Sequence, residues 1–280
     1  MINQIELIPT GIGKCLTIKS HINDKVFDNA DFDELAIINF REFDPDEKDL
    51  KIINNYFKTN KKPRLEVENH HIPFLPEVER FHIWFYSDEA IDLLKNNTVK
   101  KLTFKYTEET KKKSDLTKLL IFKDTLEELS FSDTGNYTNL EITINGLKKL
   151  KALALEKLKI DFNLIENHSL EYFFYLGSKT ADWSQASNFK KIRYCTIWAN
   201  HKIENIDFLQ AMTNLEYIEL DQCPKVSHFP NLEHLKNLRK VLLCDNKRLD
   251  DWTELKKLKN VKSNLLGDGY DNLFEQPYRY

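Results

Sequence analysis

The chain of 280 residues is poor in residues that interrupt regular structure, with seven glycines and eight prolines. Its four cysteines are too few for a disulfide framework, so we interpret them as reduced thiols of a cytoplasmic protein. No apolar run approaches the length that crosses a membrane, and residues 1–10 lack the basic start and long apolar run of a secretory signal. We therefore expect a cytoplasmic protein that does not contact membranes.

The chain also lacks an excess of charge of one sign. Its 41 basic and 44 acidic residues leave a net charge of -3, which provides no overall field for nucleic acid or an anionic membrane. Hydrophobic residues make up 41% and aromatic residues 12%, enough to bury a sizeable core, so the chain is not disordered. The abundance of Lys, Asn and Ile fits the coding bias of low-GC bacteria.

A repeat runs through most of the chain. Its two clearest copies have apolar residues at the first, fourth and sixth positions and Cys or Asn at the ninth: Leu215, Ile218, Leu220 and Cys223, then Leu238, Val241, Leu243 and Asn246. Upstream copies of the first, fourth and sixth positions are Val78, Phe81, Ile83; Val99, Leu102, Phe104; Leu126, Leu129, Phe131; Leu150, Leu153, Leu155; Leu170, Phe173, Tyr175; and Phe189, Ile192, Tyr194. Degenerate copies include Leu35 with Ile37 and Leu65 with Val67, and residues 261–266 form a weak last strand.

This spacing predicts short strands stacked in parallel. Alternate strand residues point the same way, so the fourth and sixth positions face the core while the third, fifth and seventh face outward. A single unit cannot bury its apolar side, but neighbours at about 4.8 Å can cover one another. The return segments read as helical or irregular, with Ser87 and Ser114 as predicted helix N-caps.

The repeats resemble the leucine-rich-repeat family, and those starting at Leu215 and Leu238 look like bacterial internalin-type repeats. The resemblance covers residues 62–266. It implies an α/β solenoid with a concave face lined by parallel strands and with short helices or irregular segments on the convex side. Four residues depart from the ninth-position Asn and predict irregular curvature in the middle: Thr107, Thr134, Leu158 and Ser178.

Both ends depart from the repeat, as the exposed ends of a solenoid must. We interpret residues 1–61 as an N-terminal capping region with degenerate repeats. Within it, Asp44 as N-cap, Pro45 and Glu47 resemble a capping box, before a helix with an apolar stripe. That stripe consists of Leu50, Ile53 and Phe57. Residues 267–280 are interpreted as a C-terminal cap whose aromatic residues cover the last strand.

The outward strand positions predict a binding surface. Tyr172, Phe174 and Leu176 place three large apolar groups on one strand, beside a depression at Ala152 and Ala154. The predicted partner-binding residues around them are Lys191, Arg193, Tyr217, Glu219 and Asp221, and a second aromatic spot contains His82, Trp84 and Tyr106. The alternative is that a return loop or a cap covers these strands.

No catalytic, metal or cofactor site is predicted. His70 and His71 are adjacent, so in a strand they would point to opposite faces, which favours a solvated loop over a metal site. Gly11, Gly13 and Lys14 lack the spacing of a phosphate-binding loop.

These observations favour a non-enzymatic module that binds an unidentified protein and is monomeric when unbound. One specialised form is an immunity or antitoxin-like protein that neutralises a bacterial toxin. A polyanion or nucleic-acid binder is less favoured, because the outward basic residues do not form a continuous stripe: Lys101, Lys105, Lys191 and Arg193 share the outward strand positions with Glu128, Glu156 and Glu219.

Overall fold

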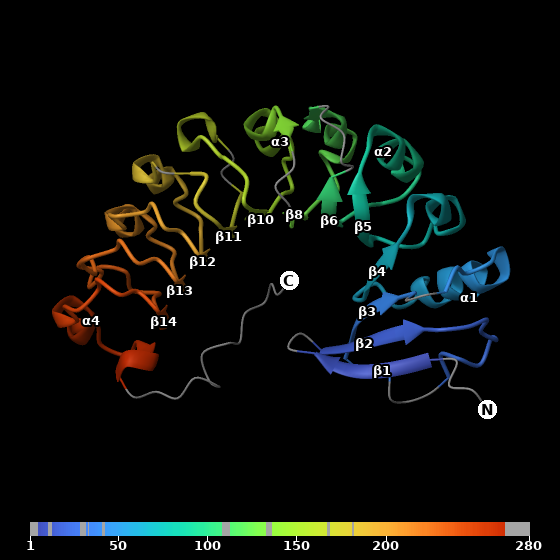
Figure 1. The fold of residues 1–280 in the computed structure, drawn as a ribbon, viewed down its shortest axis with the longest axis horizontal. Coiled ribbons are helices and arrows are strands. Elements are labelled where there is room, and N and C mark those ends of the chain that lie inside the picture. Colours follow the sequence, from blue (N-terminus) through green and yellow to red (C-terminus); the bar gives the residue numbers. More distant parts are fainter. Residues whose placement is uncertain are drawn as a thin grey trace.

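The computed structural model describes residues 5–10, 13–28, 32, 34–40, 43–107, 113–132, 136–166, 169–180 and 182–266. Within this part of the chain, thirteen strands form one sheet that bends into an arc (Figure 1). The strands line the inner, concave side, and the helices lie along the outer side. The predicted C-terminal cap, residues 267–280, falls outside the described residues.

The sheet runs in chain order: β1 (Ile5–Thr10), β2 (Gly13–Ile18), β3 (Leu35–Asn39), β4 (Arg64–Val67), β5 (Arg80–Tyr86), β6 (Lys101–Thr107), β8 (Glu128–Phe131), β10 (Ala152–Glu156), β11 (Tyr172–Leu176), β12 (Tyr194–Trp198), β13 (Tyr217–Asp221), β14 (Lys240–Cys244) and β15 (Lys262–Ser263). A separate pair joins β7 (Ser114–Asp115) to β9 (Tyr137–Thr138). The α-helices are α1 (Glu47–Phe57), α2 (Asp88–Leu94), α3 (Leu140–Gly146) and α4 (Thr253–Lys257). The 3-10 helices are η2 (Asn69–Phe74), η3 (Leu116–Phe122), η4 (Phe162–Leu164), η5 (Ser184–Asn188), η6 (Asp207–Ala211) and η7 (Asn264–Leu266).

Parallel stacking, predicted from the repeat, is confirmed from β2 onward. Successive strands pair in parallel and almost residue for residue, so that Leu153 lies beside Phe173 and Ile218 beside Val241. Apart from the copy starting at Phe189, the fourth and sixth positions of the repeats from Val78 to Leu238 are at most 4% exposed. The chain therefore forms the predicted leucine-rich-repeat solenoid, with an aliphatic and aromatic core behind the sheet.

The predicted register was wrong in one repeat. The strand β12 pairs Tyr194 with Tyr172 and Cys195 with Phe173, so the first, fourth and sixth positions are Ile192, Cys195 and Ile197. The template at Phe189 was three residues early, because Phe189 is itself buried and also follows the apolar spacing. With the corrected start, the two intervals flanking this repeat become nearly equal, which is the regularity that a stacked solenoid requires.

The turn after each strand supports this corrected register. The eighth position has a positive φ in five successive repeats, at Lys157, Gly177, Ala199, Gln222 and Asp245. Left-handed backbone costs a non-glycine residue about 1 kcal/mol or more, so its recurrence marks a turn that every repeat must make. Ala199 has this position only when the repeat begins at Ile192.

The ninth position then satisfies backbone groups at the turn, as predicted. The Asn246 side chain accepts from the Cys223 N–H at 2.9 Å and donates to the Leu220 carbonyl at 2.9 Å. The corrected register also gives an unpredicted ninth-position residue, Asn200, which accepts from the N–H groups of Lys202 and Ile203.

Two predicted departures are compensated locally. The Ser178 hydroxyl donates to the Ala199 carbonyl and accepts from the His201 N–H. Where Leu158 replaces Asn, the Tyr175 hydroxyl donates to the Leu158 carbonyl and accepts from the Thr180 N–H. A hydroxyl group thus replaces the amide in both repeats. The side chains of Thr107 and Thr134 lie outside the described part of the structure.

The N-terminal end closes the sheet with a hairpin that the sequence analysis did not predict. Strands β1 and β2 pair antiparallel, and β2 continues in parallel to β3. The helix α1 begins at Glu47, and its N-cap is Asp46, which forms a capping box with Asp49. The predicted cap at Asp44 was therefore wrong by two residues.

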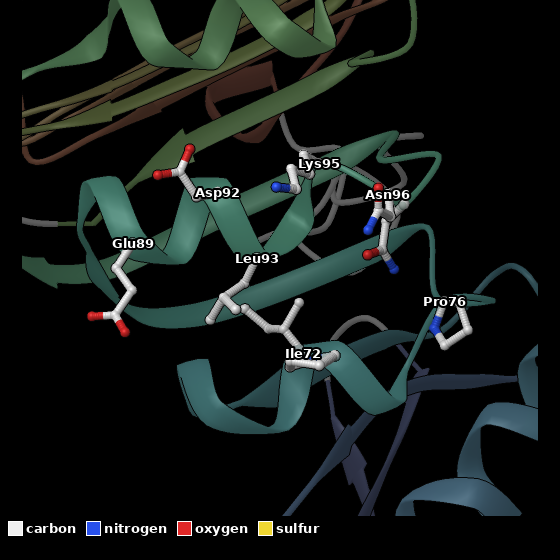
Figure 2. A pocket seen from close by; sticks show the side chains of 9 residues that line it. Ile72, Pro76, Glu89, Asp92, Leu93, Lys95 and Asn96 are labelled. Atoms are coloured by element: carbon white, nitrogen blue, oxygen red, sulfur yellow. The ribbon is translucent and has the colours of Figure 1, made fainter.

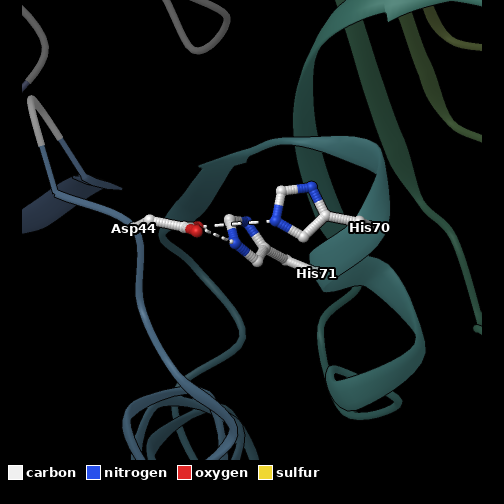
Figure 3. A group of neighbouring side chains, drawn as sticks. All are labelled: Asp44, His70 and His71. Carbon is white, nitrogen blue, oxygen red and sulfur yellow. Dashed lines mark hydrogen bonds and ion pairs between the residues drawn. The ribbon is translucent and has the colours of Figure 1, made fainter.

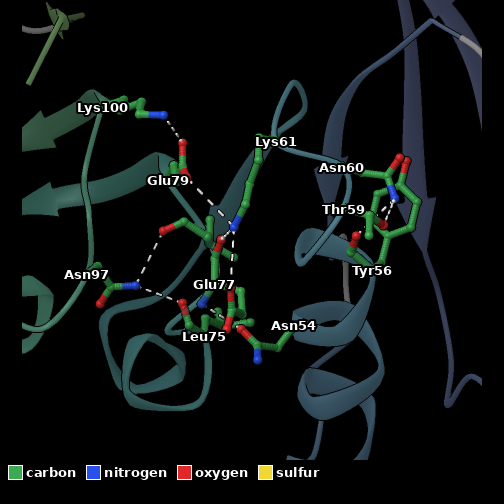
Figure 4. Close-up of polar contacts among 11 residues, drawn as sticks. Asn54, Tyr56, Thr59, Asn60, Lys61, Leu75, Glu77, Glu79, Asn97 and Lys100 are labelled. Carbon is green, nitrogen blue, oxygen red and sulfur yellow. Dashed lines mark hydrogen bonds and ion pairs between the residues drawn. The ribbon is translucent and has the colours of Figure 1, made fainter. Parts of the chain in front are cut away.

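Polar contacts fasten α1 to the first full repeats (Figure 4). The Asn54 side chain accepts from the Glu77 N–H at 2.9 Å, and Lys61 donates to the Glu77 carbonyl at 2.7 Å. The Asn97 amide donates to the Leu75 carbonyl at 2.7 Å, one repeat farther on. These side-chain bonds connect neighbouring segments of the chain outside the sheet.

The return segments are short and mainly of the 3-10 type. Ser87 caps α2 as predicted, because its hydroxyl accepts from the Ala90 N–H. Ser114 does not cap a helix: it belongs to β7, and Asp115 caps the 3-10 helix η3. The weak last strand predicted over residues 261–266 is β15 followed by η7.

We predict that the substitution Asn246→Ala lowers the free energy of unfolding by about 2 kcal/mol, because it removes two hydrogen bonds to backbone groups of buried residues, the Cys223 N–H and the Leu220 carbonyl. Urea denaturation monitored by circular dichroism measures this loss. The exposed Asn237 provides the control, since Asn237→Ala should stay within about 0.5 kcal/mol of wild type. Equal stability of the two variants would contradict the role assigned to the ninth position.

Candidate functional site: the concave face of the sheet

A charge ladder borders the concave face just before the strands begin. The second position of eight successive repeats alternates in sign: Glu79, Lys100, Glu127, Lys151, Glu171, Arg193, Glu216 and Arg239. Ion pairs join Lys100 to Glu79 at 2.6 Å and Lys151 to Glu127 at 3.2 Å. This ladder was not predicted from the sequence, because its alternation is recognisable only once the register is known.

Arg193 is the most strongly engaged member of the ladder. Its guanidinium lies 2.7 Å from Glu216 and 3.4 Å from Glu171, and it is 5.5 Å from the centre of the Tyr194 ring. The hydrogen bond from Arg193 lowers the pKa of Glu216, and the same contact raises the pKa of Arg193. Arg193 and Lys191 therefore do not belong to the outward strand columns in which the sequence analysis placed them. The three-residue register error is the reason.

We predict that Arg193→Glu lowers the free energy of unfolding by about 1 kcal/mol, because it places three carboxylates side by side on partly exposed positions. Thermal denaturation at low and high salt measures the effect, which should shrink as salt screens the repulsion. Lys191→Glu is the matched control, because Lys191 is exposed and makes no ion pair in the described structure. A loss of the same size in both variants would contradict the ladder.

The corrected register gathers aromatic residues on the concave side of the sheet. Three tyrosines occupy the third position of consecutive strands, because Tyr172, Tyr194 and Tyr217 pair in sequence. The Tyr172 and Tyr194 rings are 6.3 Å apart, and the Phe174 and Trp198 rings pack edge to face at 5.2 Å. We call Tyr172, Phe174, Tyr194, Trp198 and Tyr217 the concave aromatic cluster.

Glu219 lies within this cluster. Its carboxylate accepts from the Trp198 indole N–H at 3.0 Å and from the Tyr217 hydroxyl at 2.9 Å. Glu219 is only 4% exposed, so these bonds replace much of the hydration that burial removes. They also hold the Trp198 and Tyr217 side chains in a defined orientation.

The exposure of these residues differs from the prediction. They lie on the concave side and not in the core behind the sheet, but Tyr172, Phe174 and Tyr217 are only 2%, 8% and 1% exposed. The expected depression at Ala152 and Ala154 is not open, because both alanines are buried in the same apolar group as Tyr172 and Phe174. Pleating determined which way the side chains point, but it did not determine what remains accessible.

Accessible surface is found instead at the seventh position of the repeats. Five successive strands place half-buried residues there: Glu156, Leu176, Trp198, Asp221 and Cys244. We call this line the seventh column. Burial and the neighbouring Asp245 raise the pKa of Asp221. The misplaced template at Phe189 put Cys195 at the seventh position, but Cys195 belongs to the core, where burial raises the pKa of its thiol to about 12.

The second aromatic spot is not assembled as predicted. Trp84 is half-buried on β5, and the side chain of Tyr106 lies outside the described part of the structure. The register pairs Tyr106 with Phe85, so Trp84 and Tyr106 do not share a column. His82 faces the same side as Trp84 and lies 4.0 Å from Glu66.

On the N-terminal half of the sheet, Lys101 and Arg80 both form ion pairs with Glu128. Glu128 lies 2.7 Å from the Lys101 ammonium group and 2.9 Å from the Arg80 guanidinium. Burial raises the pKa of Glu128, but the charges of Lys101 and Arg80 outweigh it and leave the pKa below its usual value. For Lys101, burial outweighs Glu128 and lowers the pKa. Glu128 therefore neutralises one of the two positive charges at this place on the sheet.

A carboxylate whose pKa is lower in the folded than in the unfolded chain stabilises the fold at pH values above its pKa in the unfolded chain. This stabilisation is lost as the pH falls through the pKa of the carboxylate in the folded chain. We predict that wild-type stability declines below about pH 4.5, the ordinary range of a Glu. Glu128→Gln should show a smaller decline there and should lose about 2 kcal/mol at pH 7, because Lys101 keeps a buried charge without a carboxylate. Urea denaturation from pH 3 to pH 7 tests both expectations. Identical pH profiles would contradict the assignment.

A hollow of about 560 Å³ lies on the outer side of the arc, between η2 and α2 (Figure 2). Its lining includes Ile72, Leu93 and Pro76 with Glu89 and Lys95. Its lining contains no histidine, cysteine or serine. None of the helices in the described residues is long and apolar enough to cross a membrane.

Comparisons with known proteins find similar structures but no similar sequence. No family model matches the chain, and no curated protein matches it significantly. The structure is similar to internalin C2 of Listeria monocytogenes, at 19% identity over 78% of this chain and 84% of that one, with a TM-score of 0.41. It is also similar to the leucine-rich-repeat domain of the type III effector XopL, at 13% identity over 78% and 81%, with a TM-score of 0.44. A leucine-rich-repeat protein of Leptospira interrogans gives 14% identity over 84% and 73%, with a TM-score of 0.44.

Proposed function

We propose, from the premise that the chain is a leucine-rich-repeat solenoid, that it is a non-enzymatic module that binds a protein partner along its concave face. The observation that carries the proposal is the seventh column, which places partly accessible apolar and acidic groups in one row along the arc, beside the buried aromatic residues of the same strands. Parallel strands spaced at about 4.8 Å hold this row of side chains in place. Binding a partner would therefore cost the solenoid little conformational entropy.

The chemistry of the column indicates the kind of surface it binds. Leu176 and Trp198 supply apolar anchors, and aromatic anchors in rigid surroundings are frequent binding hot spots. Glu156 and Asp221 supply acidic groups beside them, and the positive charge of a basic group from a partner would offset the repulsion between Asp221 and Asp245. The partner is therefore expected to present apolar and basic side chains.

A polyanion fits this surface less well. Phosphate groups would meet the carboxylates of the seventh column, while Lys101 and Arg80 are already paired with Glu128. Neutralisation of a toxin by an immunity or antitoxin-like protein is one form of the proposed binding, and the identity of the partner would decide it.

The proposal predicts that Leu176→Asp weakens partner binding at least about 10-fold, because it places a charge among apolar contacts. Pull-down from native lysate with wild-type and variant baits, followed by titration of the recovered protein, measures the loss. Leu164→Asp is the matched control, since Leu164 is 57% exposed on the outer 3-10 helix η4. Circular dichroism checks that both variants are folded. Equal recovery of the partner by the wild-type and Leu176→Asp baits would contradict a binding site on the concave face.

A further inference from the structure

Two histidines and an aspartate meet near the N-terminal end of the arc (Figure 3). The Asp44 Oδ1 atom lies 2.8 Å from His71 Nε2 and 3.4 Å from His70 Nε2. The two imidazole rings are 3.9 Å apart between centroids. The same carboxylate oxygen therefore lies near the Nε2 atoms of both histidines.

This arrangement overturns the geometric reason for discounting the pair. Neighbouring residues of a strand point to opposite faces, but His70 and His71 are the second and third residues of a 3-10 helix, η2. The two rings lie side by side and face the segment before α1, which carries Asp44 (Figure 3). Residues 26 or more positions apart in sequence are brought together only by the packing of the first repeats.

We propose that Asp44, His70 and His71 form a three-ligand site for a divalent transition-metal ion such as Zn²⁺. Zinc bonds to imidazole nitrogen and carboxylate oxygen at about 2.0–2.2 Å, which places neighbouring ligand atoms of a tetrahedron about 3.3 Å apart. The separations of 2.8 and 3.4 Å from the shared oxygen are close to that edge. Small movements of the side chains would admit the ion.

The surroundings of the two histidines fit ligation through Nε2. Metal binding requires the proton of each imidazole to move to Nδ1. The Nδ1 atom of His70 lies 3.7 Å from the Glu68 carboxylate, which could accept a hydrogen bond from it. The buried Nδ1 atom of His71 has no hydrogen-bond partner among the described residues, so protonating it displaces no other bond.

Two of the three proposed ligands are open to solvent. The side chains of Asp44 and His70 are 78% and 60% exposed, which leaves the remaining coordination position open to water.

In a second cluster of similar composition, the carboxylates already accept hydrogen bonds from the backbone. This cluster contains His21, Asp46 and Asp49, and its two carboxylates cap the N-terminus of α1. Asp49 accepts from the Ile22 and Asp46 N–H groups, and Asp46 accepts from the N–H groups of Lys48 and Asp49. It contains a single imidazole. This cluster is a helix cap and provides a control within the same chain.

The test is isothermal titration of the full chain with ZnCl₂ in a non-chelating buffer at pH 7.4, after removal of metals with EDTA. One ion per chain is expected, and Asp44→Asn and His70→Ala should each weaken binding at least about 10-fold. Both substitutions are at exposed side chains, so folding is expected to persist, and circular dichroism checks it. Zn²⁺ should also raise the Tm of the wild-type chain, because it would join the segment before α1 to η2.

The controls are His21→Ala, from the helix-cap cluster, and His228→Ala, which removes an exposed histidine that lies 3.1 Å from Asp207. Both should bind zinc as the wild type does. Absence of binding by the wild-type chain would overturn the proposal. Undiminished binding by folded Asp44→Asn or His70→Ala would overturn it equally.

Discussion

The fold depends on parallel strands stacking without a shift between repeats. The carbonyl of each second-position residue accepts from two N–H groups of the next repeat, as when Glu216 accepts from Arg239 and Lys240. This backbone pairing recurs from Glu79 to Glu216 and sets the position of every side chain that follows it. Side chains of equal position must then lie in columns, whether they face the core or the concave side.

Three features reinforce that register at different depths. The charge ladder alternates in sign where the strands begin, so a shift in register would separate each charge from its opposite partner in the next repeat. The core positions interlock behind the sheet. The left-handed eighth position and the hydrogen-bonded ninth position then turn the chain in the same way after each strand. Individually these contributions are modest, but the solenoid repeats them.

The two functional proposals arise from different consequences of this stacking. The concave face is built by repetition, because equivalent positions of neighbouring strands form the aromatic cluster and the seventh column. The histidine and aspartate cluster is built where repetition begins, between the segment before α1 and the 3-10 helix η2. Glu219 and His71 share one property: each is a buried polar residue whose hydrogen bonds fix the geometry of its neighbours.

The amino-acid sequence by itself determined the repeat, the core positions and the direction of nearly every outward side chain, because a strand has a period of two and a solenoid needs constant spacing. It misplaced the repeat at Ile192, since Phe189 is buried outside the template and imitates its spacing. Only the tertiary structure decided which outward residues stay accessible, because exposure at Tyr172 or Leu176 depends on what packs around them. It alone also decided that His70 and His71 meet Asp44, because that contact joins distant segments through a 3-10 helix that no local pattern announced.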